Sequence, residues 1–75
     1  MDIDALLAKV EDKYQAQPHS TIDGLKIEFD KQWVHLRRSN TEPIIRIYSE
    51  SESETAANGL ANKIIADIKE ILMLN

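Results

Sequence analysis

The chain has no cysteine among its 75 residues and no long apolar run. Without cysteine, neither a disulfide nor a thiolate metal site can form, and the default expectation is a cytoplasmic protein. No apolar stretch approaches the length of about 20 residues that a membrane-spanning helix needs. Residues 1–4, Met-Asp-Ile-Asp, have neither the positive charge nor the apolar block of a signal peptide. We therefore expect no membrane partner.

An excess of basic residues is also missing. Thirteen acidic and nine basic side chains give a formal net charge of −4 at pH 7. A broad nucleic-acid surface needs a basic face, so no nucleic-acid partner is expected. The positive groups are unevenly distributed, however, because between residues 31 and 49 Glu42 is the only acid among Lys31, His35, Arg37, Arg38 and Arg46. A local basic patch in an acidic domain suits a small anionic ligand.

Two helical patterns lie at the ends of the chain. In residues 2–15, apolar side chains recur at three- and four-residue spacing, an aspartate can cap the start, and Pro18 stops the pattern. Residues 51–72 begin with Ser-Glu-Ser-Glu, which fits a capping box. Gly59 costs about 1 kcal/mol relative to alanine inside a helix, which indicates close backbone packing or a kink. The predicted buried stripe of the first helix consists of Ile3, Leu6, Leu7, Val10 and Tyr14. That of the second helix consists of Ala57, Leu60, Ala61, Ile64, Ile68, Ile71 and Leu72.

The middle of the chain alternates apolar and polar residues, as strands do. A short strand is expected within residues 19–23, and further strands at 25–29, 33–37 and 44–49, with Asp23-Gly24 as a turn. The short connections favour an antiparallel meander. The predicted fold is α+β, an antiparallel sheet of three to four strands with two helices packed on one face, similar to the TATA-binding-protein-like class. The predicted inward residues are Leu25, Ile27, Phe29, Val34, Leu36, Ile45 and Ile47, and the other face carries Trp33, His35, Arg46 and Tyr48.

The most informative segment is residues 36–43, Leu-Arg-Arg-Ser-Asn-Thr-Glu-Pro. Two guanidinium groups, two hydroxyls and an amide fall within five residues, between two predicted strands. Arginine offers a planar fork of charged donors, and hydroxyls and turn N–H groups fill the remaining directions around a tetrahedral oxyanion. Pro43 fixes its own φ and ends the loop sharply. The segment is typical of a phosphate-binding loop.

This loop and the strand after it, Ile-Ile-Arg-Ile-Tyr-Ser-Glu at 44–50, resemble the α-D-phosphohexomutases. In the fourth, C-terminal domain of that family, which includes phosphoglucomutase/phosphomannomutase and phosphoglucosamine mutase, the loop commonly runs Arg-Pro-Ser-Gly-Thr-Glu-Pro. The resemblance extends from about residue 21 to the end of the chain. Arg38 replaces the frequent proline and Asn40 the frequent glycine. Asparagine also tolerates a left-handed backbone, so the turn should survive.

The resemblance implies that residues 1–75 are the C-terminal domain of a larger phosphohexomutase, which moves phosphate between the 1- and 6-positions of a hexose. Its expected partners are the phosphate group of a hexose phosphate and the other domains of the same chain. The implied phosphate-binding residues are Arg37, Ser39, Asn40 and Thr41. The resemblance also implies a catalytic phosphoserine and Mg²⁺ in other domains, so this domain alone should bind no metal and catalyse nothing.

Several single residues allow other interpretations. Arg37 could pair with Glu42 in an ordinary polar turn, and Arg46 is expected to be a cross-strand partner of an acid such as Glu28. A stand-alone hydrolase could use Ser39 with His35 as its base, but no orienting acid is evident. His19 and His35 lack the spacing of metal ligands. A stand-alone module that binds an anion or a nucleic acid is the remaining functional alternative.

Overall fold

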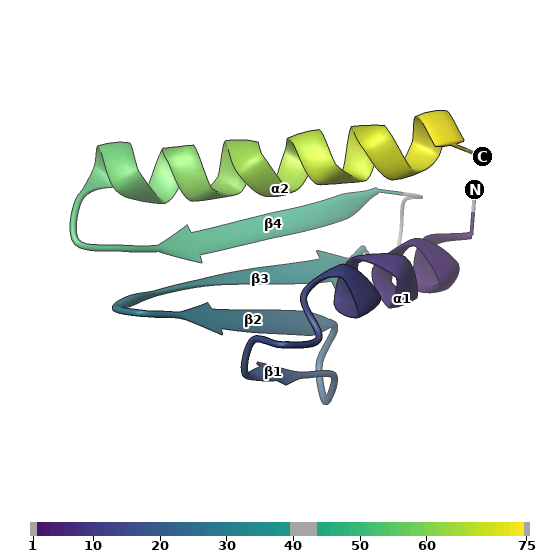
Figure 1. The fold of residues 1–75 in the computed structure, drawn as a ribbon, viewed down its shortest axis with the longest axis horizontal. Helices are drawn as coiled ribbons and strands as arrows, with labels where there is room; N and C mark the ends of the chain where they lie inside the picture. Colours follow the sequence, from purple (N-terminus) through teal and green to yellow (C-terminus); the bar gives the residue numbers. More distant parts are fainter. Residues whose placement is uncertain (1, 40–43, 75) are drawn as a thin grey trace.

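The computed structural model describes residues 2–39 and 44–74, and Figure 1 shows the elements in the order helix, four strands, helix. Helix α1 spans Ile3–Lys13 and helix α2 spans Glu54–Leu74. The strands are β1 His19–Ser20, β2 Leu25–Phe29, β3 Gln32–Arg38 and β4 Ile45–Glu50. They form one antiparallel sheet in the order β1-β2-β3-β4. The predicted α+β fold is confirmed, with four strands.

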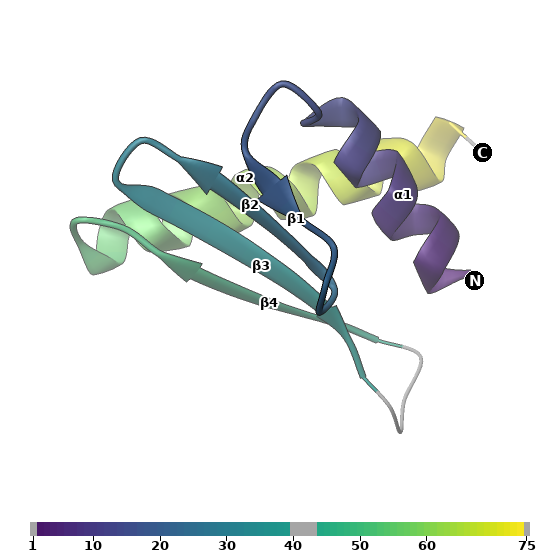
Figure 2. The ribbon, with the colours of Figure 1, turned by 90° about the horizontal axis from the view of Figure 1, so that it is seen from below.

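Both helices cover the same face of the sheet (Figure 2). Every second residue of β2 and β3 points toward the helices, which close the core from above. Each fully buried apolar side chain contributes about 1.5–3 kcal/mol on leaving water. The largest fully buried side chains are Val10, Leu25, Ile27, Val34, Leu36 and Ile64. Because neighbouring strand residues alternate between faces, the core positions also determine which side chains occupy the uncovered face.

The helix starts are capped as helix physics requires, but one cap differs from the prediction. Asp2 caps α1, because its carboxylate accepts a hydrogen bond from the N–H of Ala5 at 3.2 Å. In α2 the cap is Ser53, whose hydroxyl oxygen accepts from the N–H of Ala56 at 3.1 Å. The predicted capping box starting at Ser51 is therefore wrong. The Ser51 hydroxyl donates instead to the side-chain oxygen of Gln32, at 2.9 Å.

Two expectations for α2 are also wrong. A Cβ built on Gly59 would meet no heavy atom within 4 Å, so this glycine neither packs closely nor marks a contact. It lies on the solvent side of an uninterrupted helix. Leu72, expected in the buried stripe, is 45% exposed. Figure 1 shows the reason, since the last turns of α2 extend past the strands.

Candidate functional site

The predicted phosphate loop joins β3 to β4. Strand β3 ends at Arg38, and the N–H of Ser39 donates to the carbonyl of Ile44 at 3.1 Å, which holds the two sides of the hairpin together. Of the four predicted site residues, Arg37 and Ser39 lie in the described part of the chain. Asn40 and Thr41 lie outside the described residues.

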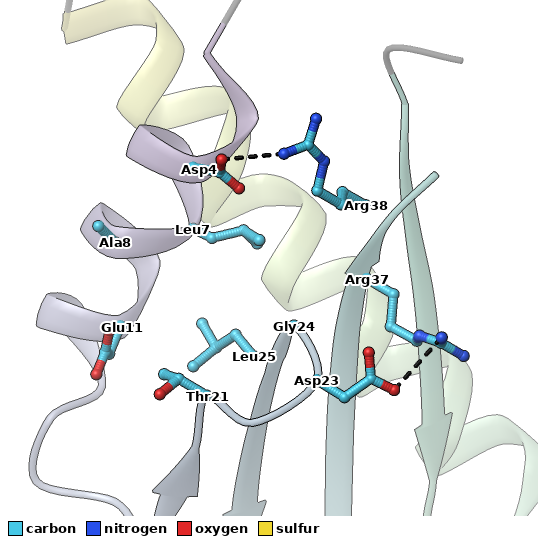
Figure 3. A pocket seen from close by; sticks show the side chains of 10 residues that line it. All are labelled: Asp4, Leu7, Ala8, Glu11, Thr21, Asp23, Gly24, Leu25, Arg37 and Arg38. Carbon is cyan, nitrogen blue, oxygen red and sulfur yellow. Dashed lines mark hydrogen bonds and ion pairs between the residues drawn. The ribbon is translucent and has the colours of Figure 1, made fainter. Parts of the chain in front are cut away.

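Arg37 is on the face of the sheet opposite the helices and is paired with an aspartate. Its Nη2 lies 3.3 Å from Oδ2 of Asp23, in the turn that precedes β2 (Figure 3). Its side chain is 49% exposed, so much of the guanidinium remains accessible to a ligand.

Arg46 lies directly opposite Arg37 in the register of β3 and β4. The predicted pairing of Arg46 with Glu28 is wrong. Glu28 is in β2, opposite Trp33, and β3 separates that strand from β4. Among the ion pairs of residues 2–39 and 44–74, none involves Arg46. Two like charges therefore occupy directly opposed positions at the base of the loop, and the Asp23 carboxylate beside Arg37 offsets part of their repulsion.

Arg38 points to the other side of the strand, toward α1 (Figure 3). Its Nη1 lies 3.0 Å from Oδ2 of Asp4. Both side chains of this ion pair are more than half exposed, at 56% for Arg38 and 69% for Asp4. A cavity of about 370 Å³ lies between α1 and the turn before β2, with both arginines among its lining residues.

The turn that carries Asp23 is fixed against β3. Gly24 has φ of +72°, and a Cβ there would lie 2.3 Å from the carbonyl oxygen of Leu36. Only glycine fits such a conformation and such a close backbone approach. The carbonyl of Asp23 accepts a hydrogen bond from Nε2 of His35, which also keeps the turn in place. The structure thus holds a carboxylate beside Arg37 through several contacts.

Ser39 lies in an enclosed position, with only 7% of its surface exposed. His35 uses its Nε2 to hold the turn at Asp23. Because Nε2 of His35 is engaged with the Asp23 carbonyl, the geometry gives no support to the alternative of a Ser–His hydrolase.

Comparison with known proteins fits the loop chemistry. Residues 1–67 match the family model described as "Phosphoglucomutase/phosphomannomutase, C-terminal domain". The chain belongs to this family.

Relatives in the phosphoglucomutase/phosphomannomutase family carry related names. A phosphoglucomutase/phosphomannomutase of Thermococcus kodakarensis is 48% identical over 58 residues, which is 75% of this chain and 13% of that protein. A phosphoglucosamine/phosphogalactosamine mutase of Sulfurisphaera tokodaii is 50% identical over 44 residues, 59% of this chain and 10% of that protein. A phosphomannomutase of Escherichia coli is 38% identical over 66 residues, 84% of this chain and 14% of that protein. The chain therefore spans only a small part of each relative.

In this member of the phosphoglucomutase/phosphomannomutase family, a polar cluster between the helices was not predicted from the sequence. Tyr14 donates a hydrogen bond to the carboxylate of Asp67, which also accepts from Lys13 at 3.0 Å. Lys63 donates to the Tyr14 hydroxyl at 2.6 Å. Asp67 could have been noticed because it lies on the apolar stripe of α2, between Ile64 and Ile68. Its partners on α1 cannot be identified from sequence spacing.

The charges of this cluster stabilise one another. Burial alone would raise the pKa of Asp67, but hydrogen bonds from Tyr14 and Lys13 and the charges of Lys63 and Lys13 outweigh it and lower that pKa. Burial, reinforced by the hydrogen bond to Asp67, raises the pKa of Tyr14. The cluster connects α1 to α2 and lies away from the loop, so its role is to hold the two helices together.

Residues 2–39 and 44–74 contain neither a cluster of metal ligands nor a membrane-spanning helix. No group of three or more histidine, cysteine, aspartate or glutamate side chains is placed to hold a metal ion there. His19 pairs with Glu11 at 3.2 Å. No helix in this part of the chain is long and apolar enough to cross a membrane.

Proposed function

We propose that this chain is the C-terminal domain of a phosphohexomutase, an enzyme that moves phosphate between the 1- and 6-positions of a hexose phosphate. The domain holds the phosphate group that is not reacting. The proposal is supported by the family match, by the mutase names of the relatives and by the chemistry of the loop. The observation that carries it is the opposed pair Arg37 and Arg46 at the base of that loop.

Arg37 is the principal charged ligand in this proposal. Its guanidinium is half exposed and lies on the uncovered face, where a phosphate can approach without displacing a helix. A charge-assisted hydrogen bond of this kind contributes about 1.5–3 kcal/mol. Arg46, the direct partner of Arg37 in the register of β3 and β4, adds a second positive charge on the same face of the sheet.

The remaining proposed ligands are the hydroxyls of Ser39 and Thr41 and an amide or backbone donor from Asn40. These groups recognise phosphate oxygens and are indifferent to the stereochemistry of the sugar. A clamp of this composition can hold either end of a hexose bisphosphate. Its contribution to phosphoryl transfer is positioning, which supplies much of the catalysis in such reactions.

The catalytic phosphoserine and the Mg²⁺ that the resemblance implies belong to the rest of the proposed enzyme. The described residues fit that division, because no group of three or more histidine, cysteine, aspartate or glutamate side chains among them is placed to hold a divalent cation. The domain on its own should bind phosphate weakly and have no mutase activity.

A titration of the ¹⁵N-labelled chain with glucose 6-phosphate tests the proposal. We expect the amide resonances of residues 37–41 to shift first, and Arg37→Ala to suppress these shifts. Arg38→Ala is the matched control, since this neighbouring arginine faces α1 and should leave the titration almost unchanged. Shifts confined to Trp33 or to the helices would overturn the proposal.

A further inference from the structure

The ion pair between Asp23 and Arg37 occupies part of the proposed phosphate site. Figure 3 shows the Asp23 carboxylate directed at the Arg37 guanidinium, with Oδ2 and Nη2 3.3 Å apart. Both side chains are well exposed, at 66% and 49%. Water and small anions can therefore reach the guanidinium and exchange with the carboxylate.

Asp23 is held in this position by its backbone. Gly24 lies so close to β3 that its own missing Cβ would collide with the Leu36 carbonyl. His35 donates a hydrogen bond to the carbonyl of Asp23. These backbone contacts do not depend on the charge of the Asp23 side chain. The turn therefore keeps Asp23 beside Arg37 whether or not the ion pair forms.

The surrounding charges show what this carboxylate does. Arg46 stands opposite Arg37, which leaves two positive groups and one fixed negative group on this patch of the sheet. A carboxylate oxygen and a phosphate oxygen are alternative acceptors for the same guanidinium N–H donors. The carboxylate also repels an incoming phosphate, and this repulsion is moderated by solvent and salt.

We infer that Asp23 is an internal competitor for Arg37, a carboxylate fixed by the Gly24 turn that weakens phosphate binding and so allows rapid release. This inference rests on the proposed function and adds a residue to it. Asp23 acts through Arg37 and is a positioning residue. A second acid–arginine pair, Asp4 with Arg38, has similar exposure but faces α1, so it provides a matched comparison.

The test is a titration with inorganic phosphate at pH 7 and constant ionic strength, followed through the amide resonance of residue 37. The 75-residue chain can be used because its core is formed by its own helices and sheet. The variants are Asp23→Asn, Asp23→Glu, Asp4→Asn and Arg37→Ala. Signal dispersion in the same spectra reports whether each variant is folded.

We expect Asp23→Asn to lower the dissociation constant for phosphate by roughly two- to five-fold, the range set by the strength of exposed ion pairs. Asp23→Glu, which keeps the charge, should stay close to wild type. Asp4→Asn changes the net charge equally but should have a smaller effect. The difference between wild type and Asp23→Asn should shrink as sodium chloride is raised, which a merely structural role would not produce.

The outcomes separate this inference from the proposed function. If Arg37→Ala abolishes phosphate binding but Asp23→Asn leaves it unchanged or weaker, the inference is overturned and the phosphate site stands. Equal tightening by Asp4→Asn and Asp23→Asn also overturns the inference, because the effect then comes from net charge alone. If phosphate does not perturb Arg37 in the wild type or in any variant, the proposed function and the inference both fail.

Discussion

Arg37 and Arg46 face each other as direct partners in the antiparallel register of β3 and β4. Like charges at directly opposed positions of a strand pair destabilise a sheet. Here they lie next to the loop whose residue types favour phosphate. Asp23 offsets part of this repulsion from the side of Arg37, and a bound anion would relieve more of it.

Replacing Arg46 with glutamine should make the chain more stable and its phosphate site weaker. Removing the repulsion with Arg37 should raise the free energy of unfolding by about 0.2–1 kcal/mol at low salt. Urea denaturation measures this value, and the gain should disappear in high salt because salt screens exposed charges. Arg38→Gln is the control and should give no gain, since it removes a partner of Asp4. An unchanged midpoint for Arg46→Gln at low salt would contradict the prediction.

In the phosphohexomutase that we propose, Arg37→Ala should lower kcat/KM, raising the activation free energy by about 2 kcal/mol or more, the loss expected for a charge-assisted contact. Steady-state mutase kinetics measure this loss. Arg38→Ala, in the neighbouring position on the opposite side of β3, should have a much smaller effect. A value for Arg37→Ala within twofold of wild type would remove Arg37 from the site.

The two glycines should respond to alanine in opposite directions. Gly24→Ala should destabilise the chain by about 2 kcal/mol or more, because it combines a left-handed φ with a clash against the Leu36 carbonyl. Gly59→Ala should stabilise it by about 1 kcal/mol, because its helical position is open and alanine is the better helix former. Thermal or urea unfolding of both variants checks the pair. Similar effects of the two substitutions would show that the turn before β2 is not constrained as described.

Asp67 should make the chain sensitive to acid. Its pKa is lowered in the folded state from an ordinary value of 3.8, so its contribution to stability is present above about pH 4 and is lost as pH falls through the folded pKa. At pH 7, Asp67→Asn should cost about 1–3 kcal/mol, and the difference from wild type should shrink in acid.

Glu70→Gln is the control for Asp67, because Glu70 also lies near Lys13, at 3.7 Å, but is exposed. It should change the free energy of unfolding little at any pH. Urea denaturation at a series of pH values measures both variants. A pH-independent difference between wild type and Asp67→Asn would contradict the assigned charge state.

The spacing of apolar residues along the chain was sufficient to predict most of the fold. The alternation at Val34 and Leu36 predicts which face of β3 is buried, because a strand has a period of two residues. The α1 stripe ending at Tyr14 predicts its packing in the same way. These features depend only on neighbours along the chain.

Features that depend on distant partners could not be predicted. The residue opposite Arg46 follows from the register of β3 and β4, which the sequence does not specify. Glu28, the expected ion-pair partner of Arg46, lies two strands away in β2. The Tyr14–Asp67 contact joins residues 53 positions apart. The cap of α2 lies at Ser53 rather than Ser51 because either serine is chemically suitable, and the path of the chain after β4 decides between them.

Adjacent side chains of β3 serve different halves of the molecule, Arg37 outside and Arg38 toward α1. Deleting one residue from the connection between β2 and β3 would shift the strand by one position relative to its neighbour. Arg38 would then move to the outer face, but Val34 and Leu36 would move out of the interior with it. A register shift of β3 therefore cannot move the arginines to the other face without also exposing the core residues of the strand. The proposed phosphate-binding face of β3 can therefore change by substitution, whereas an insertion or deletion that shifts the register of β3 would cause misfolding.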